Sequence, residues 1–209
     1  MNSDSWIVKV EPSNQGGLEH REVYGYAGMA LSLAQTLEHV LKTFIVLAAA
    51  IERRGPQPLT ADELAGFNAD LEKFEAETFK KTLGPLIDSI KSRFHFQAKP
   101  DLKTDLAQSL VDRNQLVHHF FWDRAVEQQS SHGRYRMAEE LTRIQKQLRR
   151  TIEDFSDATK AIRYAMGITE ERIDEVVEAA KAGATEEEIK EVVRRGLKCA
   201  RSLAPKGDE

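Results

Sequence analysis

Apolar residues recur every three and four positions through the first quarter of the chain, from Val23 to Ile51. At this spacing they form one stripe along one face of an α-helix, because a helix turns once every 3.6 residues. The stripe consists of Val23, Tyr26, Ala30, Leu33, Leu37, Val40, Phe44, Leu47 and Ile51. The segment "RRGPQP" ends this helix, and the pattern sets the expectation of an all-α fold.

Four further helical segments follow the first one. A capping box from Thr60 to Glu63 opens a helix that runs to about Lys81, and residues 84–94 predict a third helix with Pro85 in its first turn. A fourth helix is expected over residues 101–128. A fifth carries Met137, Leu141, Ile144, Leu148, Phe155, Ile162 and Met166 on one face. Residues 21–167 are therefore predicted to form an up-and-down bundle of four to five helices.

The two ends of the chain differ from this region. Residues 1–20 form an N-terminal arm with one strand-like run, "WIVKV". Residues 169–184 and 185–200 repeat one pattern, which predicts a small helical hairpin over residues 168–200 joined at Gly183, with a disordered tail over 201–209. A hairpin of this kind either closes the end of the bundle or docks a partner protein such as a cognate inhibitor.

Composition narrows the class of protein. The chain has 209 residues, of which 41% are hydrophobic, and a formal net charge of −4, so a nucleic-acid site would have to be local. The single cysteine, Cys199, fits a reducing compartment. The longest apolar run, residues 44–51, is shorter than the roughly 20 residues of a membrane span, so we expect a cytoplasmic protein without a membrane partner.

The fourth helix contains polar residues in unexpected places. Its apolar stripe is expected to contain Leu106, Leu110, Val117 and Phe121, with Leu102 and Phe120 flanking it. Arg113 falls inside that stripe, where a guanidinium is costly unless it is paired. Either an acid such as Glu38 on the first helix pairs with it, or the stripe opens into a polar cleft. Asn114 and His118 share one edge of the stripe, whereas His119 points to the opposite side.

The segment "RNQLVH", from Arg113 to His118, resembles the signature of the HEPN superfamily, in which an arginine precedes a histidine by four to six intervening residues. The resemblance covers residues 113–118 as a motif and residues 22–166 as an architecture. It implies an all-α domain, usually dimeric, that acts as a metal-independent endoribonuclease, often as a toxin or defence effector controlled by an antitoxin. Phe120 stands where many of these toxins have a tyrosine that the antitoxin modifies, so such modification is not expected here.

The residue types suit RNA cleavage without a metal or cofactor. A neutral imidazole at His118 can take the proton of an RNA 2′-hydroxyl. Arg113 can hold the phosphate, and Asn114 can orient the imidazole or bind a phosphate oxygen. Glu38 and His119 are expected to act only indirectly. Because one chain leaves the general acid unassigned, a homodimer with a composite site is expected.

A path for RNA is the remaining requirement. Arg136, Arg143 and Arg150 repeat every seven residues on the fifth helix and share a face. This face is either an ordinary solvated surface or an electrostatic track for a phosphate backbone. Two alternatives to the nuclease stay open: a HEPN-like helical module that binds nucleotide, RNA or protein without cutting, and an unrelated helical interaction protein.

Overall fold

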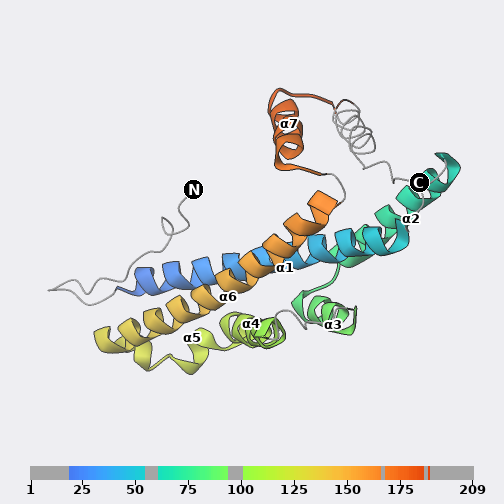
Figure 1. Ribbon diagram of the computed structural model, residues 1–209. Helices are drawn as coiled ribbons and strands as arrows, with labels where there is room; N and C mark the ends of the chain where they lie inside the picture. Colours follow the sequence, from blue (N-terminus) through green and yellow to red (C-terminus); the bar gives the residue numbers. More distant parts are fainter. Residues whose placement is uncertain (1–18, 55–60, 94–100, 166–167, 186–187, 189–209) are drawn as a thin grey trace.

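The computed structural model describes residues 19–54, 61–93, 101–165, 168–185 and 188, and every element in these ranges is helical (Figure 1). The elements are α1 (His20–Arg54), α2 (Ala61–Phe79), α3 (Leu83–Arg93), α4 (Asp101–His118), α5 (Phe120–Asp123), the 3₁₀ turn η2 (Glu127–Gln129), α6 (Ser131–Ala165) and α7 (Glu170–Lys181). The all-α prediction is confirmed for these residues. The strand-like run, the Thr60 cap and the C-terminal tail lie outside them.

The two longest described helices, α1 and α6, have 35 residues each. They lie side by side and run in the same direction, as the colours in Figure 1 show. The ring of Phe44 meets that of Phe155 edge-on at 5.1 Å between centroids. Their facing stripes form the centre of the core, with Val23, Ala30, Leu37, Leu41 and Ile45 from α1 and Met137, Leu141, Ile144, Leu148 and Phe155 from α6.

The buried face of α1 rotates along the helix relative to the predicted stripe. Val23, Ala30 and Leu37 are fully buried, but Ile51 is 40% exposed. A stripe that steps by three and four has a period of 3.5, and a straight helix drifts by about 20° per heptad from that period. Over four heptads the drift reaches about 80°, so the second half of α1 buries Leu41, Ile45 and Ala48 instead.

The short helices α2 and α3 pack around the C-terminal half of α1. The ring of Phe74 in α2 is close to two guanidinium groups. That of Arg53 from α1 lies 4.7 Å from the ring centroid, and that of Arg93 from α3 lies 5.5 Å from it. These cation–π contacts join three helices at one aromatic ring. Helix α3 buries Leu83, Leu86, Ile87 and Ile90.

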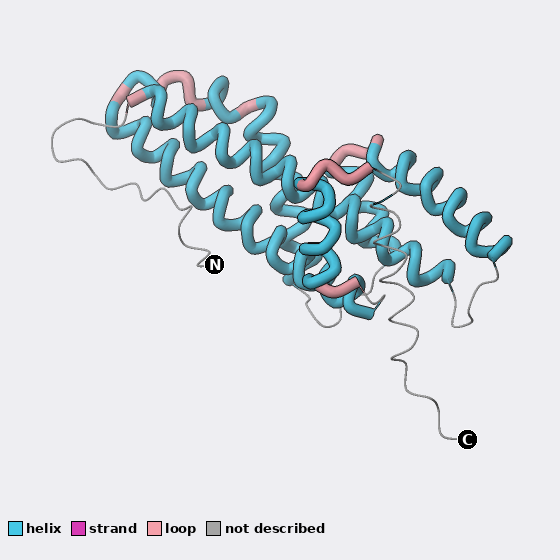
Figure 2. The backbone as a smooth tube through the Cα atoms, turned by 90° about the horizontal axis from the view of Figure 1, so that it is seen from above, coloured by secondary structure: helices cyan, strands magenta, loops and turns pink. Residues whose placement is uncertain are grey.

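The motif-bearing helix α4 runs across the long pair. In Figure 1 it is seen nearly along its own axis below α6, and in Figure 2 loops join the helices with no strand drawn among the described residues. This crossing departs from an up-and-down order of all the helices. It sets α4 against both long helices and leaves one of its faces in solvent.

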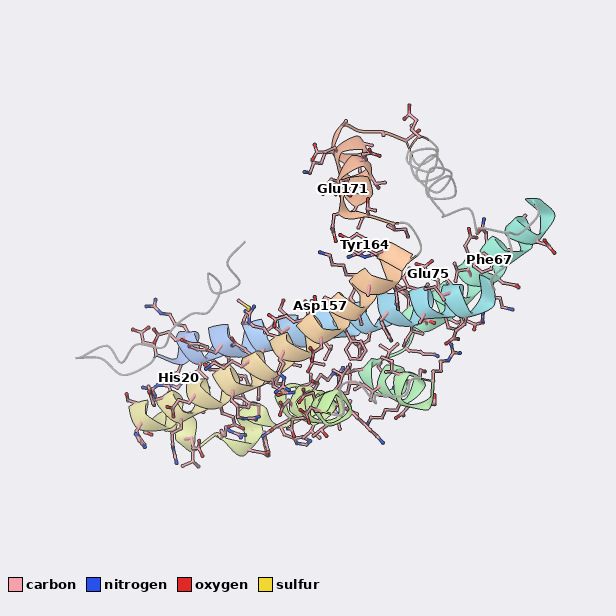
Figure 3. All side chains as sticks on the ribbon, viewed as in Figure 1. His20, Phe67, Glu75, Asp157, Tyr164 and Glu171 are labelled. Carbon is pink, nitrogen blue, oxygen red and sulfur yellow. The ribbon has the colours of Figure 1, made fainter. Side chains whose placement is uncertain are left out.

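Of the predicted C-terminal hairpin, the structure describes the first helix and the turn that follows it. Glu170 at the start of α7 pairs with Lys160 at 3.4 Å and Arg163 at 3.7 Å, and Figure 3 shows Tyr164 and Glu171 at this junction of α6 with α7. Gly183, with φ +81°, ends α7 in the left-handed conformation that glycine adopts without strain. The predicted break at Gly183 is therefore confirmed.

The second repeat begins with a capping box that the first repeat lacks. The N–H of Thr185 donates to Glu188 Oε2 at 2.8 Å, and the N–H of Glu188 donates back to Thr185 Oγ1 at 3.4 Å. Hydrogen bonds from the backbone and then the side chain of Thr185 lower the pKa of the Glu188 carboxyl. The matching position of the first repeat holds Arg172, which cannot accept such a bond.

Helix α1 is long and apolar enough, by length and composition, to cross a membrane. A core helix of a soluble protein meets the same criterion, and 44% of the apolar window is buried inside the protein. The length and composition of α1 are therefore only weak evidence for a membrane-spanning helix.

Candidate functional site on the motif helix

The buried face of α4 is not the face that the apolar residues predict. Its buried residues are Leu102, Asp105, Leu106, Ser109, Asp112 and Leu116, and Phe120 continues the series beyond its end. Leu110 and Phe121 are half-buried, and Val117 is 46% exposed. The prediction of the buried face was therefore wrong, because the helix is rotated about its axis relative to the apolar stripe. Three polar residues, Asp105, Ser109 and Asp112, lie on the side that faces α6.

Asp112, which the sequence analysis did not single out, is the charged residue that α4 buries most completely. Its side chain is 1% exposed. Gln108 Nε2 donates to Asp112 Oδ1 at 2.9 Å, and Arg143 Nη2 lies 3.4 Å from the same oxygen. A buried carboxylate requires such partners because it leaves water on folding. The costly polar position on this helix therefore belongs to Asp112 rather than to its neighbour Arg113.

All three arginines of the proposed RNA track have acidic partners. Arg143 pairs with Asp112 at 3.4 Å, and Arg150, seven residues later on α6, pairs at 3.4 Å with Asp105, seven residues earlier on α4. Arg136 lies 3.9 Å from Glu127 of η2. Their side chains remain between 54% and 60% exposed, but their charges are partly neutralised. The heptad repeat on α6 thus matches acids on α4 and η2, and Asp105 and Asp112, seven residues apart, were the sequence signal for it.

Arg113 differs from these three arginines. It is half-buried, and its Nη1 donates to Asn114 Oδ1 at 3.2 Å. Among the described residues no carboxylate, that of half-buried Glu38 included, lies within ion-pairing distance of it. The structural alternative of an Arg113–Glu38 ion pair is therefore not found. The guanidinium keeps donors available for an external anion.

Asn114 and His118 lie on the solvent side of α4. Both are exposed, and the Asn114 carbonyl accepts its hydrogen bond from Arg113 rather than from the imidazole of His118. Arg113 and His118 are five residues apart, which places them about 140° apart around the helix axis. A single chain thus presents the two residues on different sides of one helix and does not bring them together.

The motif helix is shorter than predicted, because α4 ends at His118 instead of continuing to Gln128. His119, with φ −130°, separates α4 from the four-residue helix α5, and the turn leads on to η2. The two imidazoles are exposed, with 6.1 Å between their ring centroids. Both histidines therefore lie in a turn at the surface.

The aromatic residues beyond the motif have separate roles. Phe120 is buried in the core, and the ring of Phe121 lies 4.8 Å from that of Tyr24 on α1. In contrast, Trp122 is 85% exposed and Val126 is 87% exposed. Phe120 and Phe121 are thus both packed within the chain.

Comparisons with family models, with curated proteins and with solved structures found no match for this chain. In the described part of the chain, no group of three or more His, Cys, Asp or Glu side chains is placed to hold a metal ion. The functional argument therefore depends on the side chains of α4 and the turn that follows it.

Proposed function

We propose that this chain is a HEPN-type endoribonuclease, acting in the cytoplasm as a homodimeric toxin or defence effector that needs no metal. The observation that carries the proposal is that Arg113, a half-buried residue, has no acidic partner for its guanidinium among the described residues. Arg136, Arg143 and Arg150 on α6 each have one. An arginine held by its helix and left without a counter-ion is suited to bind a phosphate.

The proposed reaction uses the 2′-hydroxyl of the RNA as the nucleophile. The imidazole of His118 takes the 2′-hydroxyl proton while the 2′-oxygen bonds to phosphorus and the bond to the 5′-oxygen breaks. Arg113 stabilises the charge that develops on the phosphate oxygens. The 5′-oxygen leaves with a proton from a general acid, which gives a 2′,3′-cyclic phosphate and a 5′-hydroxyl.

A second copy of the chain supplies what one chain lacks. Since Arg113 and His118 diverge on one helix, the proposed site pairs Arg113 with His118 of the partner subunit across a two-fold axis. The two histidines of the pair have separate roles: one His118 takes the 2′-hydroxyl proton, and the protonated His118 of the partner subunit donates a proton to the departing 5′-oxygen. Val111, which is 57% exposed, and Val117 lie on the solvent side of α4 and give this contact an apolar surface.

The test is incubation of the purified protein with a mixed RNA pool in EDTA. We expect cleavage in single-stranded regions and 2′,3′-cyclic ends, with Arg113→Ala reducing the rate by about 10²–10³ and His118→Ala abolishing it. His119→Ala is the matched control, because His119 is also an exposed histidine, one residue away, and its variant should retain activity. Circular dichroism and light scattering must show that each variant stays helical and keeps the size of the wild type.

The second candidate is a non-catalytic HEPN-like module that binds nucleotide, RNA or a protein partner such as an antitoxin. The divergence of Arg113 from His118 within one chain favours it, because a phosphate-binding arginine needs no nearby base to bind. If the wild-type protein leaves the RNA pool intact in EDTA but binds it in an Arg113-dependent way, this second function replaces the first.

A further inference from the structure

One carboxylate of α6 faces the turn that carries both histidines. Glu140 accepts hydrogen bonds from two nitrogens of Arg124, from Nε at 2.8 Å and from Nη2 at 2.5 Å. The pair is bidentate, which fixes the orientation of the guanidinium as well as its position. Both side chains are largely buried, at 16% exposure for Arg124 and 26% for Glu140.

Arg124 also contacts the start of α5. Its guanidinium carbon lies 4.5 Å from the centroid of the Phe120 ring, and its Nη1 donates to the Phe120 carbonyl oxygen at 3.5 Å. Phe120 is 1% exposed and belongs to the core. Arg124 is therefore held between a buried ring and a carboxylate, and it ties the end of the turn to α6.

Glu140 reaches the other end of the turn as well. Gln115 in the last turn of α4 lies with its Nε2 at 3.5 Å from Glu140 Oε1, a long hydrogen bond. The carbonyl oxygen of Gln115 accepts from the N–H of His119 at 2.9 Å. One carboxylate thus contacts residues before and after the two histidines, with the stronger contact on the later side.

From these contacts we infer that Glu140 is a positioning residue that holds the His118–His119 turn in one conformation on α6. Besides the buried ring of Phe120 and the contact of Phe121 with Tyr24, the turn has no side-chain cap, and α5 has only four residues. An isolated helix of this length is unstable in water. Without the carboxylate, the buried guanidinium of Arg124 loses its counter-ion, and the turn must open to hydrate it.

The first experiment follows histidine resonances in protein labelled at histidine. Glu140→Gln should shift or broaden the signals of His118 and His119, while those of His20 and His39 on α1 stay in place. Arg124→Lys keeps the charge but loses the bidentate geometry, so it should give a smaller change of the same kind.

The matched control removes another acid from the same helix contact. Asp105 is the partner of Arg150, and it lies near the start of α4, far from the histidines at the end of that helix. Asp105→Asn removes this partner. We expect it to leave the signals of His118 and His119 unchanged. Unchanged signals in Glu140→Gln, or equal changes in Glu140→Gln and Asp105→Asn, would overturn the inference.

The second experiment measures catalysis and rests on the proposed function. Glu140→Gln should lower kcat about tenfold or more with little change in KM, because the displaced group is the proposed base and not the substrate-binding arginine. Exchanging the pair, with Arg124→Glu and Glu140→Arg together, should recover part of kcat. A fall in kcat matched by the loss of folded protein argues against positioning. If the wild type cleaves nothing, the proposed function fails, while the histidine signals still decide the inference.

Discussion

At the scale of single residues, burial and close approach decide what each side chain does. Asp112 is buried where its neighbour Arg113 is only half-buried, although both lie on the same turn of α4. Gly133 in the first turn of α6 is another such position. A Cβ placed on it would clash with the backbone carbonyl group of Glu127, so α6 and η2 approach each other too closely there for any side chain.

Gly133→Ala should therefore destabilise the protein, although alanine is the better helix former. The clash is with backbone, which cannot rotate away, so we expect a loss of about 1–3 kcal/mol in the free energy of unfolding. Gly28→Ala on α1 is the control, because nothing lies within 4 Å of the added Cβ, and it should stabilise by about 0.4–1 kcal/mol. Urea denaturation measures both, and a gain in stability for Gly133→Ala would contradict the close approach.

At the scale of elements, the contact between α4 and α6 is polar where the contact between α1 and α6 is apolar. Besides its two arginine–aspartate pairs, it includes the hydroxyls of Ser109 and Thr151, 3.3 Å apart and both buried. These groups fix which residues of α4 face α6, because each buried polar atom needs its partner. They therefore also fix which residues of α4 face solvent.

Arg143→Ala should lower stability more than Arg136→Ala. The first substitution leaves the buried carboxylate of Asp112 with fewer partners, at about 1–3 kcal/mol, whereas the second removes a surface pair with Glu127 worth less than about 1 kcal/mol. Thermal unfolding of the two variants decides the order. Equal small losses, together with weaker RNA binding in both, would instead favour the electrostatic track that the heptad spacing suggested.

At the scale of the whole molecule, several large apolar side chains stay exposed after the core is formed. Trp122, Val126, Val111 and Val117 are exposed on α4 and on the segment that follows it. A stable homodimer buries about 800 Å² on each subunit, and apolar residues favour its centre. The proposed composite site requires its two-fold axis to lie here.

Light scattering should show a dimer at micromolar concentration, and Val117→Asp should convert it to a monomer, because a carboxylate would be buried without a partner. Trp122 offers a second measurement. The chain has two tryptophans, so Trp6→Phe leaves Trp122 as the single reporter, and its emission should shift to shorter wavelength as the protein concentration rises. A monomer at all concentrations would remove both the dimer and the composite site.

The sequence by itself determined the helical class and the position of most helices. Apolar residues at a spacing of three and four predicted α1 and α6, and proline, glycine and capping residues located α2, α3 and the turn at Gly183, because these signals act within one turn of the chain. The motif from Arg113 to His118 was visible in the same way. The sequence did not show which face of α4 is buried, and it did not show that α4 ends at His118.

Only the tertiary structure decided which polar residues are buried and which arginines are neutralised. Asp112 can be buried because Arg143, 31 residues away in the chain, lies opposite it on α6. The same contact partly neutralises the charge of Arg143. The same holds for Glu140 and Arg124, which contact each other across the turn. A pattern along one helix cannot reveal such pairs, because the free energy of burying a charge depends on the helix that packs against it.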